Sequence, residues 1–185
     1  MVALLSAFSS VPELLRTYSL FRLFPILSPM RALPLAQAAL TSPRLLQTRF
    51  DSLSTLRALP ASSPTTLLLA HARNDGEIPL AHGQALFDGL LETALGGGGR
   101  PRARADSMSI EAIELYRLEW DAWRAREAER TERTVVPGWG EIKRFARADD
   151  GKTGQVVFLE ALAGGHDSLG GSEGVVALLG SVWAI

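Results

Sequence analysis

Thr65-Thr-Leu-Leu-Leu-Ala-His-Ala72 is the stretch that decides the fold. It is a continuous apolar run of strand length that follows Pro64, and such runs are typical of a parallel strand buried on both faces. The polar loop Arg73-Asn-Asp-Gly-Glu-Ile78 comes next, and Pro79 opens a helix that we predict to end at Gly96. The apolar side chains on one side of this helix are Leu80, Phe87, Leu90, Leu91 and Ala94. Strand, loop and helix in this order make half of a βαβ unit.

Two further apolar runs predict strands, at Val2 to Phe8 and at Gln155 to Ala161. After the first, Ser10-Val-Pro-Glu13 has the pattern of a capping box, so we expect a helix to begin near Val11. A last helix is expected from about Ser172. This order of elements predicts an α/β fold with a sheet of about three parallel strands, flanking helices and right-handed crossovers.

The segments between these strands are less regular. Residues 24–64 are rich in Ser and Pro and predict an irregular helical segment. Residues 96–150 contain a flexible Gly/Arg-rich linker at 96–104 and an amphipathic helix from Asp106 to about Thr134. The residues that repeat at helical spacing are Ile110, Ile113, Tyr116, Trp120 and Trp123. We expect the tryptophans to be packing anchors and the charged end at 124–133 to be solvated.

The composition fits one globular domain over residues 1–185, with 19 Lys+Arg against 20 Asp+Glu and a net charge of -1. This balance provides no excess of positive charge for phosphates, so nucleic acid is not an expected partner. Because the chain has no Cys, covalent catalysis would need Ser or Thr. The glycines at 96–99 lack the Lys and Ser/Thr of a phosphate loop, and no cofactor is predicted. Prolines and charges interrupt the apolar start, so we expect no signal peptide and no transmembrane segment. This pattern favours an intracellular location but leaves the localisation open.

Two residues with catalytic chemistry follow predicted parallel strands. Asp75 comes shortly after the strand that ends at Ala72, and His166 follows the strand that ends at Ala161. Because functional groups of open α/β sheets gather on loops at the carboxyl ends of strands, we expect the two side chains to lie within hydrogen-bond reach. The alternative is structural: Asp75 would cap its own loop and His166 would be an ordinary loop histidine.

Both loops resemble those of the α/β-hydrolase family, whose acid loop commonly reads H-G-x-x-D-x-x-V-P and whose catalytic histidine follows a glycine before the last helix. His71, Asp75 and Pro79 match the first pattern, with Ala72 in place of the usual Gly, and His166 matches the second. Further segments resemble a fungal branch related to lysophospholipid and monoacylglycerol lipases: Ala7 to Leu15, Gly83 to Phe87, Pro137 to Gly140, Gly164 to Ser168 and Ser172 to Gly174.

This resemblance implies a partial α/β-hydrolase fold whose strands correspond to the last three of the usual eight, with residues 96–150 as a family-specific insertion. It also implies a parent activity, the hydrolysis of a carboxylic ester and in particular of a lipid ester. By resemblance, Asp75 orients the imidazole of His166. His166 then serves as general base toward a serine and as general acid toward the leaving group.

The serine nucleophile is missing from the expected place. The family carries it in a G-x-S-x-G turn between a strand and a helix ahead of the acid, and nothing before Asp75 matches. Gly170-Gly-Ser-Glu-Gly174 has the right letters, but Ser172 follows the histidine and lies far from a strand end, so we interpret it as a helix N-cap. Ser9 and Ser10 lack flanking glycines and are interpreted as turn and cap residues.

The sequence therefore predicts an incomplete triad with Asp75 and His166 but no nucleophile, and a chain that is inactive alone as a fragment or degenerate hydrolase. His71 and His82 do not have the spacing of a metal site. The alternative function is a noncatalytic interaction module. An open edge at the strand near Val2 would favour self-association or aggregation of the chain.

Overall fold

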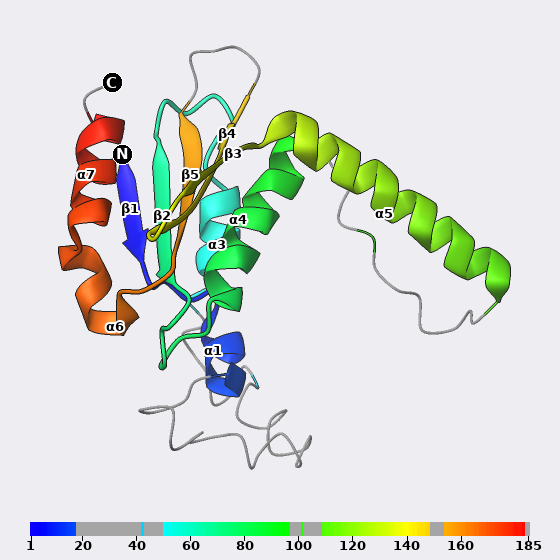
Figure 1. Ribbon diagram of the computed structural model, residues 1–185. Helices are drawn as coiled ribbons and strands as arrows, with labels where there is room; N and C mark the ends of the chain where they lie inside the picture. Colours follow the sequence, from blue (N-terminus) through cyan, green and yellow to red (C-terminus); the bar gives the residue numbers. More distant parts are fainter. Residues whose placement is uncertain (18–41, 43–49, 97–100, 102–108, 149–153, 184–185) are drawn as a thin grey trace.

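A computed structural model describes residues 1–17, 42, 50–96, 101, 109–148 and 154–183. Its centre is a five-stranded sheet in the order β1-β2-β5-β4-β3, with helices on both faces (Figure 1). Within the described residues, no helix combines the length and apolar character needed to cross a membrane.

Three neighbouring strands are parallel: β1 (Val2–Leu5), β2 (Leu67–Ala72) and β5 (Gln155–Ala161). They lie where the three apolar runs predict them. All six residues of β2 are buried, as expected for a central strand covered on both faces. β1 is an edge strand, and Val2 and Leu5 are 42% and 39% exposed.

The predicted α/β class is confirmed, but the sheet is mixed: beside the three parallel strands it has two antiparallel strands, which the prediction of about three parallel strands did not include. β4 (Gly140–Ala146) pairs antiparallel with β5, and β3 (Glu132–Val136) pairs antiparallel with β4. The region predicted as a helical insertion therefore also contains a hairpin. The helix before β3 was predicted to run to about Thr134, but it ends at Arg130. The predicted helix therefore covered the first residues of β3, and the strand was not recognised.

The turn of the hairpin could have been recognised. Pro137 and Gly138 are its central residues, Gly138 has φ 76, and Trp139 N–H donates to the carbonyl oxygen of Val136 at 3.0 Å. Pro followed by a residue with positive φ is typical of a type II turn, where Gly is favoured because it has no Cβ. Pro-Gly between two runs of β-branched and charged residues is a hairpin signal.

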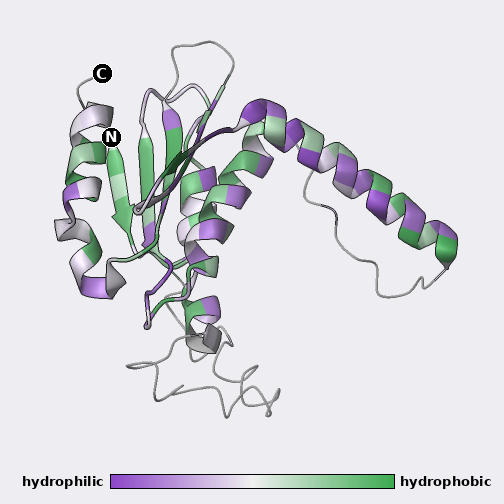
Figure 2. Cartoon of the chain, viewed as in Figure 1, coloured by the Kyte–Doolittle hydropathy of each residue, from purple (hydrophilic) through white to green (hydrophobic). Residues whose placement is uncertain are grey.

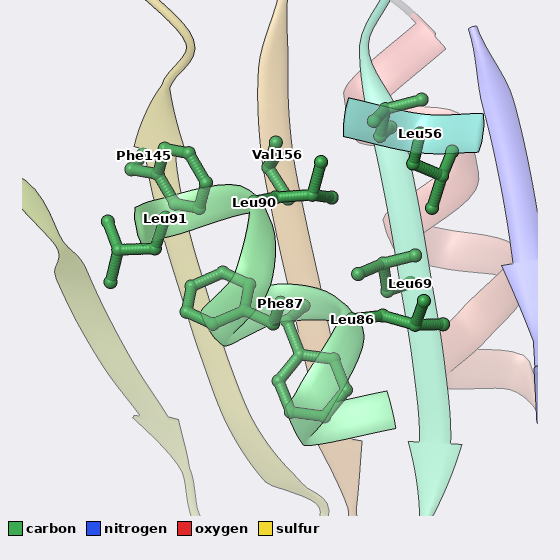
Figure 3. Close-up of a cluster of buried hydrophobic side chains, with 10 residues drawn as sticks. Leu56, Leu69, Leu86, Phe87, Leu90, Leu91, Phe145 and Val156 are labelled. Carbon is green, nitrogen blue, oxygen red and sulfur yellow. The ribbon is translucent and has the colours of Figure 1, made fainter. Parts of the chain in front are cut away.

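One face of the sheet packs against α3 (Ser52–Arg57) and α4 (Ala81–Ala94). Figure 3 shows the core between them, in which Phe87 of α4 contacts the rings of Phe145 and Phe158 at centroid distances of 5.2 and 5.5 Å. α4 forms the predicted helix after the acid loop.

α1 (Val11–Thr17) begins where the capping box predicts, and Ser10 Oγ accepts a hydrogen bond from Glu13 N–H at 3.4 Å. Most of the segment 24–64 lies outside the described residues, and its described part contains α3.

The other face packs against α6 (Gly165–Ser168), the short 3-10 helix η2 (Leu169–Gly171) and α7 (Glu173–Trp183). Leu169 and Val175 are fully buried there against small residues of β2 and β5. β2 and β5 are therefore sandwiched between two helical layers, which explains why their sequences are apolar without alternation.

α5 (Ile110–Arg130) forms the predicted helix, but its burial is the reverse of the expectation. The apolar beginning projects away from the sheet (Figures 1 and 2), with Ile110 77% exposed and Leu118 60% exposed. The charged end reaches the body, where Arg130 donates to the carbonyl oxygen of Ala146 at 3.0 Å. Apolar residues lie on opposite sides of this helix, so it is not amphipathic. Of the two tryptophans expected to be anchors, Trp123 is buried and Trp120 is half-buried.

The Gly/Arg-rich linker lies outside the described residues apart from Gly96 and Pro101.

The hairpin packs against α7 through the indole of Trp139, which lies on Gly174. A Cβ added at Gly174 would be 1.3 Å from Cζ2 of Trp139, so no other residue fits there while Trp139 keeps its position. Gly180 lies in the same helix, and a Cβ added there would meet nothing within 4 Å. The two glycines are a matched pair that separates helix propensity from packing.

We expect Gly174→Ala to lower the free energy of unfolding by about 1 to 3 kcal/mol, because the added methyl group displaces the Trp139 indole from its packed position. Gly180→Ala is expected to raise it by about 0.5 to 1 kcal/mol, since alanine in a helix restricts the unfolded chain. Urea denaturation of both variants measures the difference. Equal stabilisation by the two substitutions would show that the hairpin is not packed on α7.

Candidate active site

The candidate active site lies at the carboxyl ends of β2 and β5. The parallel register pairs Ala72 with Ala161, the last residues of the two strands. Arg73 N–H continues the ladder by donating to the carbonyl oxygen of Ala161 at 2.8 Å. The loops that follow both strands therefore start side by side.

Asp75 is held in its loop by backbone hydrogen bonds. Its Oδ1 accepts from the N–H groups of Glu77 and Ile78, both at 2.9 Å, and its side chain is 0% exposed. An Asp side chain commonly closes a turn in this way. Asp75 thus caps its own loop, as the structural alternative expected, and its second oxygen, Oδ2, remains for another partner.

His166 is positioned by two glycines and one amide. Gly164 and Gly165 have φ values of 149 and 61, in the region that favours glycine, and they turn the chain from β5 into α6. Gly165 N–H donates to Oδ1 of Asn74 at 3.0 Å, which ties the histidine loop to the acid loop. Asn74 lies in the acid loop directly before Asp75, but this role could not be deduced from the sequence.

The imidazole of His166 completes the coordination of the carboxylate. Nδ1 of His166 lies 3.0 Å from Oδ2 of Asp75. Burial alone would raise the pKa of Asp75, but the hydrogen bonds from Ile78 N–H, His166 and Glu77 N–H outweigh it and hold that pKa below its usual range. The ionised carboxylate can only accept, so Nδ1 carries the proton and Nε2 carries the lone pair in neutral His166.

His71 is a second, buried histidine beside the same carboxylate. In the sequence it matched the acid-loop motif and did not have the spacing of a metal ligand, and neither observation predicted this contact. Its Nε2 lies 2.8 Å from the carbonyl oxygen of Ile78 and 3.5 Å from Oδ2 of Asp75. Nε2–H donates to that carbonyl, and Nδ1 has no hydrogen-bond partner in the described part of the chain. A Cβ added at Gly83 would be 3.0 Å from this Nδ1. Burial lowers the pKa of His71, and the bond to Ile78 and the charge of Asp75 oppose this only in part.

His82 joins α4 to the beginning of the chain. Its Nδ1 accepts from Ser9 N–H at 3.3 Å and lies 3.0 Å from Ser9 Oγ, while Nε2 lies 2.6 Å from Thr17 Oγ1. Because Nδ1 accepts a backbone N–H, Nε2 carries the proton of the neutral ring. Burial lowers the pKa of His82, against a smaller opposite effect of Glu13. Ser9 is therefore a partner of His82, in agreement with its interpretation as a turn residue.

No serine hydroxyl among the described residues contacts His166. Ser172 Oγ donates to the carbonyl oxygen of Leu169 at 2.8 Å and accepts from Val175 N–H at 3.4 Å, which is the expected N-cap role. Ser6 was missed by the sequence analysis because no glycine flanks it. It follows β1 directly and has φ 48, two features of a nucleophile turn, but its Oγ is buried and has no hydrogen-bond partner within the described chain.

The described residues contain no group of three or more His, Asp or Glu side chains that could hold a metal ion. Comparison of the chain with protein-family models, curated proteins and solved structures gives no match.

We expect the free energy of unfolding to fall as the pH is lowered from about 7 to about 5. His71 and His82 have lowered pKa values in the folded chain, so the unfolded chain takes up protons near 6.5 before the folded chain does. Asp75 contributes outside this window, because its lowered pKa stabilises the fold at pH above 3.8 and that stability is lost only below it.

Urea denaturation at several pH values measures this slope, and His82→Gln provides the matched variant because an amide can both accept from Ser9 and donate to Thr17. The variant should lose part of the pH dependence. A wild-type stability that is flat over this range, or an unchanged slope in the variant, would contradict the neutral, buried histidines.

Proposed function

We propose that Asp75 and His166 are the acid and base of a serine-dependent ester hydrolase site on a partial α/β-hydrolase fold. The observation that carries this proposal is the 3.0 Å contact between His166 Nδ1 and a fully buried Asp75 carboxylate. The two residues come from separate loops, in the order acid then histidine, and each loop follows a parallel strand. A capping role alone explains Oδ1 of Asp75 but not the partner of Oδ2.

The chemistry follows from the fixed tautomer. Asp75 holds the Nδ1 proton, which leaves the lone pair of Nε2 for a substrate or nucleophile, and the His166 side chain is 30% exposed. Nε2 would take the proton of a nucleophile's hydroxyl group while the oxygen of that hydroxyl attacks an ester carbonyl carbon. The same nitrogen would then give that proton to the alkoxide that leaves. The resulting imidazolium is stabilised by the Asp75 carboxylate.

The proposed substrate class is a carboxylic ester, in particular a lipid ester, and it rests on the resemblance of the loop and hairpin segments to fungal lipases. Among the described residues, no serine hydroxyl forms a hydrogen bond with His166, so the described part of the proposed site has no nucleophile. Loss of a nucleophile leaves only the residual catalysis of the remaining groups. The chain is therefore proposed to be a fragment or degenerate member that is inactive alone.

Labelling of the purified chain with a fluorophosphonate tests this proposal, because the probe modifies only a serine activated by a base. We expect no serine to be labelled while an active serine esterase in the same tube is labelled fully. Hydrolysis of p-nitrophenyl butyrate by the chain should equal that of His166→Gln to within about twofold.

Two outcomes would overturn the claim of inactivity. One is a labelled serine, with Ser6 and Ser172 as the first positions to map by mass spectrometry. The other is an esterase rate at least about tenfold above that of His166→Gln, which corresponds to about 1.4 kcal/mol of transition-state stabilisation.

A second candidate function is a noncatalytic interaction module, and the exposed edge strand favours it. Val2 and Leu5 of β1 are 42% and 39% exposed, and the outer edge of β1 has no pairing strand among the described residues. Unpaired edges invite association with another strand. If a serine of the chain is labelled in the fluorophosphonate experiment, the chain is not solely an interaction module.

A further inference from the structure

A cavity of about 300 Å³ lies at the end of the sheet opposite the candidate active site. It is enclosed by the end of α3 and the turn after it, by α4, and by the neighbouring ends of β4 and β5. Its apolar wall includes Leu56, Leu59, Leu90, Phe145 and Val156, four of which are labelled in Figure 3. Neither Asp75 nor His166 lines it, because both follow the carboxyl ends of the strands.

Arg147 contributes a buried positive charge to this wall. It follows the last residue of β4 and is only 8% exposed. Nη2 donates to the carbonyl oxygen of Leu59 at 2.8 Å, whereas Nη1 is shielded from water and has no hydrogen-bond partner among the described residues. No carboxylate of the described residues forms an ion pair with Arg147. Burial lowers the pKa of Arg147, and no opposing charge contributes.

This arrangement is energetically costly for the fold. A guanidinium stays protonated in proteins, so Arg147 cannot relieve its burial by losing its charge. A buried charge without a counterion is destabilising, and a bound anion would remove that penalty. The other arginine on the wall is already neutralised, because Arg57 donates to the carbonyl oxygen of Gly89 at 3.0 Å and pairs with Glu92 at 2.8 Å. Arg147 is therefore the cation that is available to a ligand.

We propose that this cavity is a binding site for a monocarboxylate with an apolar tail, such as a medium-chain fatty acid. The carboxylate would pair with the guanidinium of Arg147, and the tail would lie against Leu56, Leu90 and the other apolar residues of the wall. Small-molecule sites have this character: a volume of about 300 Å³ or more, predominantly apolar walls and a few polar groups that orient the ligand. A free phosphate fits less well, since it offers nothing to the apolar wall. The proposal does not depend on the proposed function.

Isothermal titration calorimetry with the full chain tests the ligand class, with octanoate, octanol and inorganic phosphate as probes. We expect octanoate to bind at least tenfold more tightly than octanol, because only the carboxylate pairs with Arg147, and phosphate to show no binding. Failure of octanoate to bind would overturn the proposal, as would equal affinities for octanoate and octanol. Binding of phosphate as tight as that of octanoate would indicate a simple anion site and would also overturn it.

Variants then locate the site. Arg147→Gln keeps a donor for Leu59 but removes the charge, and it should weaken octanoate binding at least tenfold, whereas Arg147→Lys should retain part of the affinity. Arg144→Gln is the matched control on β4, because Arg144 is 53% exposed and pairs with Glu132 at the surface. Octanoate affinity that is unchanged in Arg147→Gln would overturn the assignment. If that variant does not fold, a photoreactive octanoate analogue on the wild-type chain decides: crosslinks at residues 56–61 support the site, and crosslinks confined elsewhere refute it.

Discussion

The parallel pairing of β2 with β5 is the constraint on which the rest of the structure depends. β2 is buried along its whole length, lies between β1 and β5, and receives a helical layer on each face. Its register with β5 pairs Ala72 with Ala161, so the loops that begin at Arg73 and Leu162 leave the same edge of the sheet at neighbouring positions. Asp75 and His166 are neighbours for this reason, although 91 residues separate them. A slip by one residue would turn the apolar set of either strand to the other face and separate the loops.

The sequence was sufficient for this centre because its signals are local and strong. The run at 65–72 has no polar residue between Thr66 and His71, and its short length together with the flanking Pro64 and polar loop favours a buried strand over a helix. The loop residues then follow from topology, since carboxyl ends of parallel strands share one edge. The catalytic roles of Asp75 and His166 remain predictions, because geometry shows a contact and not a reaction.

The helix α5 and the turn at Pro137-Gly138 have signals in the sequence, but the strand pairing and the burial around them do not. β4 is a strand because it pairs with β5, and the buried residue of α5 is Trp123; both are tertiary contacts that the sequence pattern does not encode. The charged residues of β3 fit a solvated helix as well as an edge strand. Trp139 on Gly174 and the bond from Gly165 to Asn74 are likewise contacts across long separations, visible only after folding.

The two ends of the sheet treat buried charge differently. At the carboxyl ends, the Asp75 carboxylate accepts two backbone N–H groups and one imidazole, and a charge so satisfied is stable in a buried place. At the other end, the guanidinium of Arg147 has one carbonyl partner and no counterion among the described residues. The carboxylate of Asp75 is therefore compensated within the chain, whereas the guanidinium of Arg147 would gain a counterion from the proposed ligand.

The tautomer of His166 tests the central claim most directly, and nitrogen-15 NMR of the histidine side chains reads it. The account predicts that His166 at neutral pH carries its proton on Nδ1, and that His71 and His82 carry theirs on Nε2 and serve as internal references. Asp75→Asn should abolish the preference of His166 alone. A His166 ring protonated on Nε2 in the wild-type chain, or a tautomer unaffected by Asp75→Asn, would contradict the claim that Asp75 prepares His166 as a base.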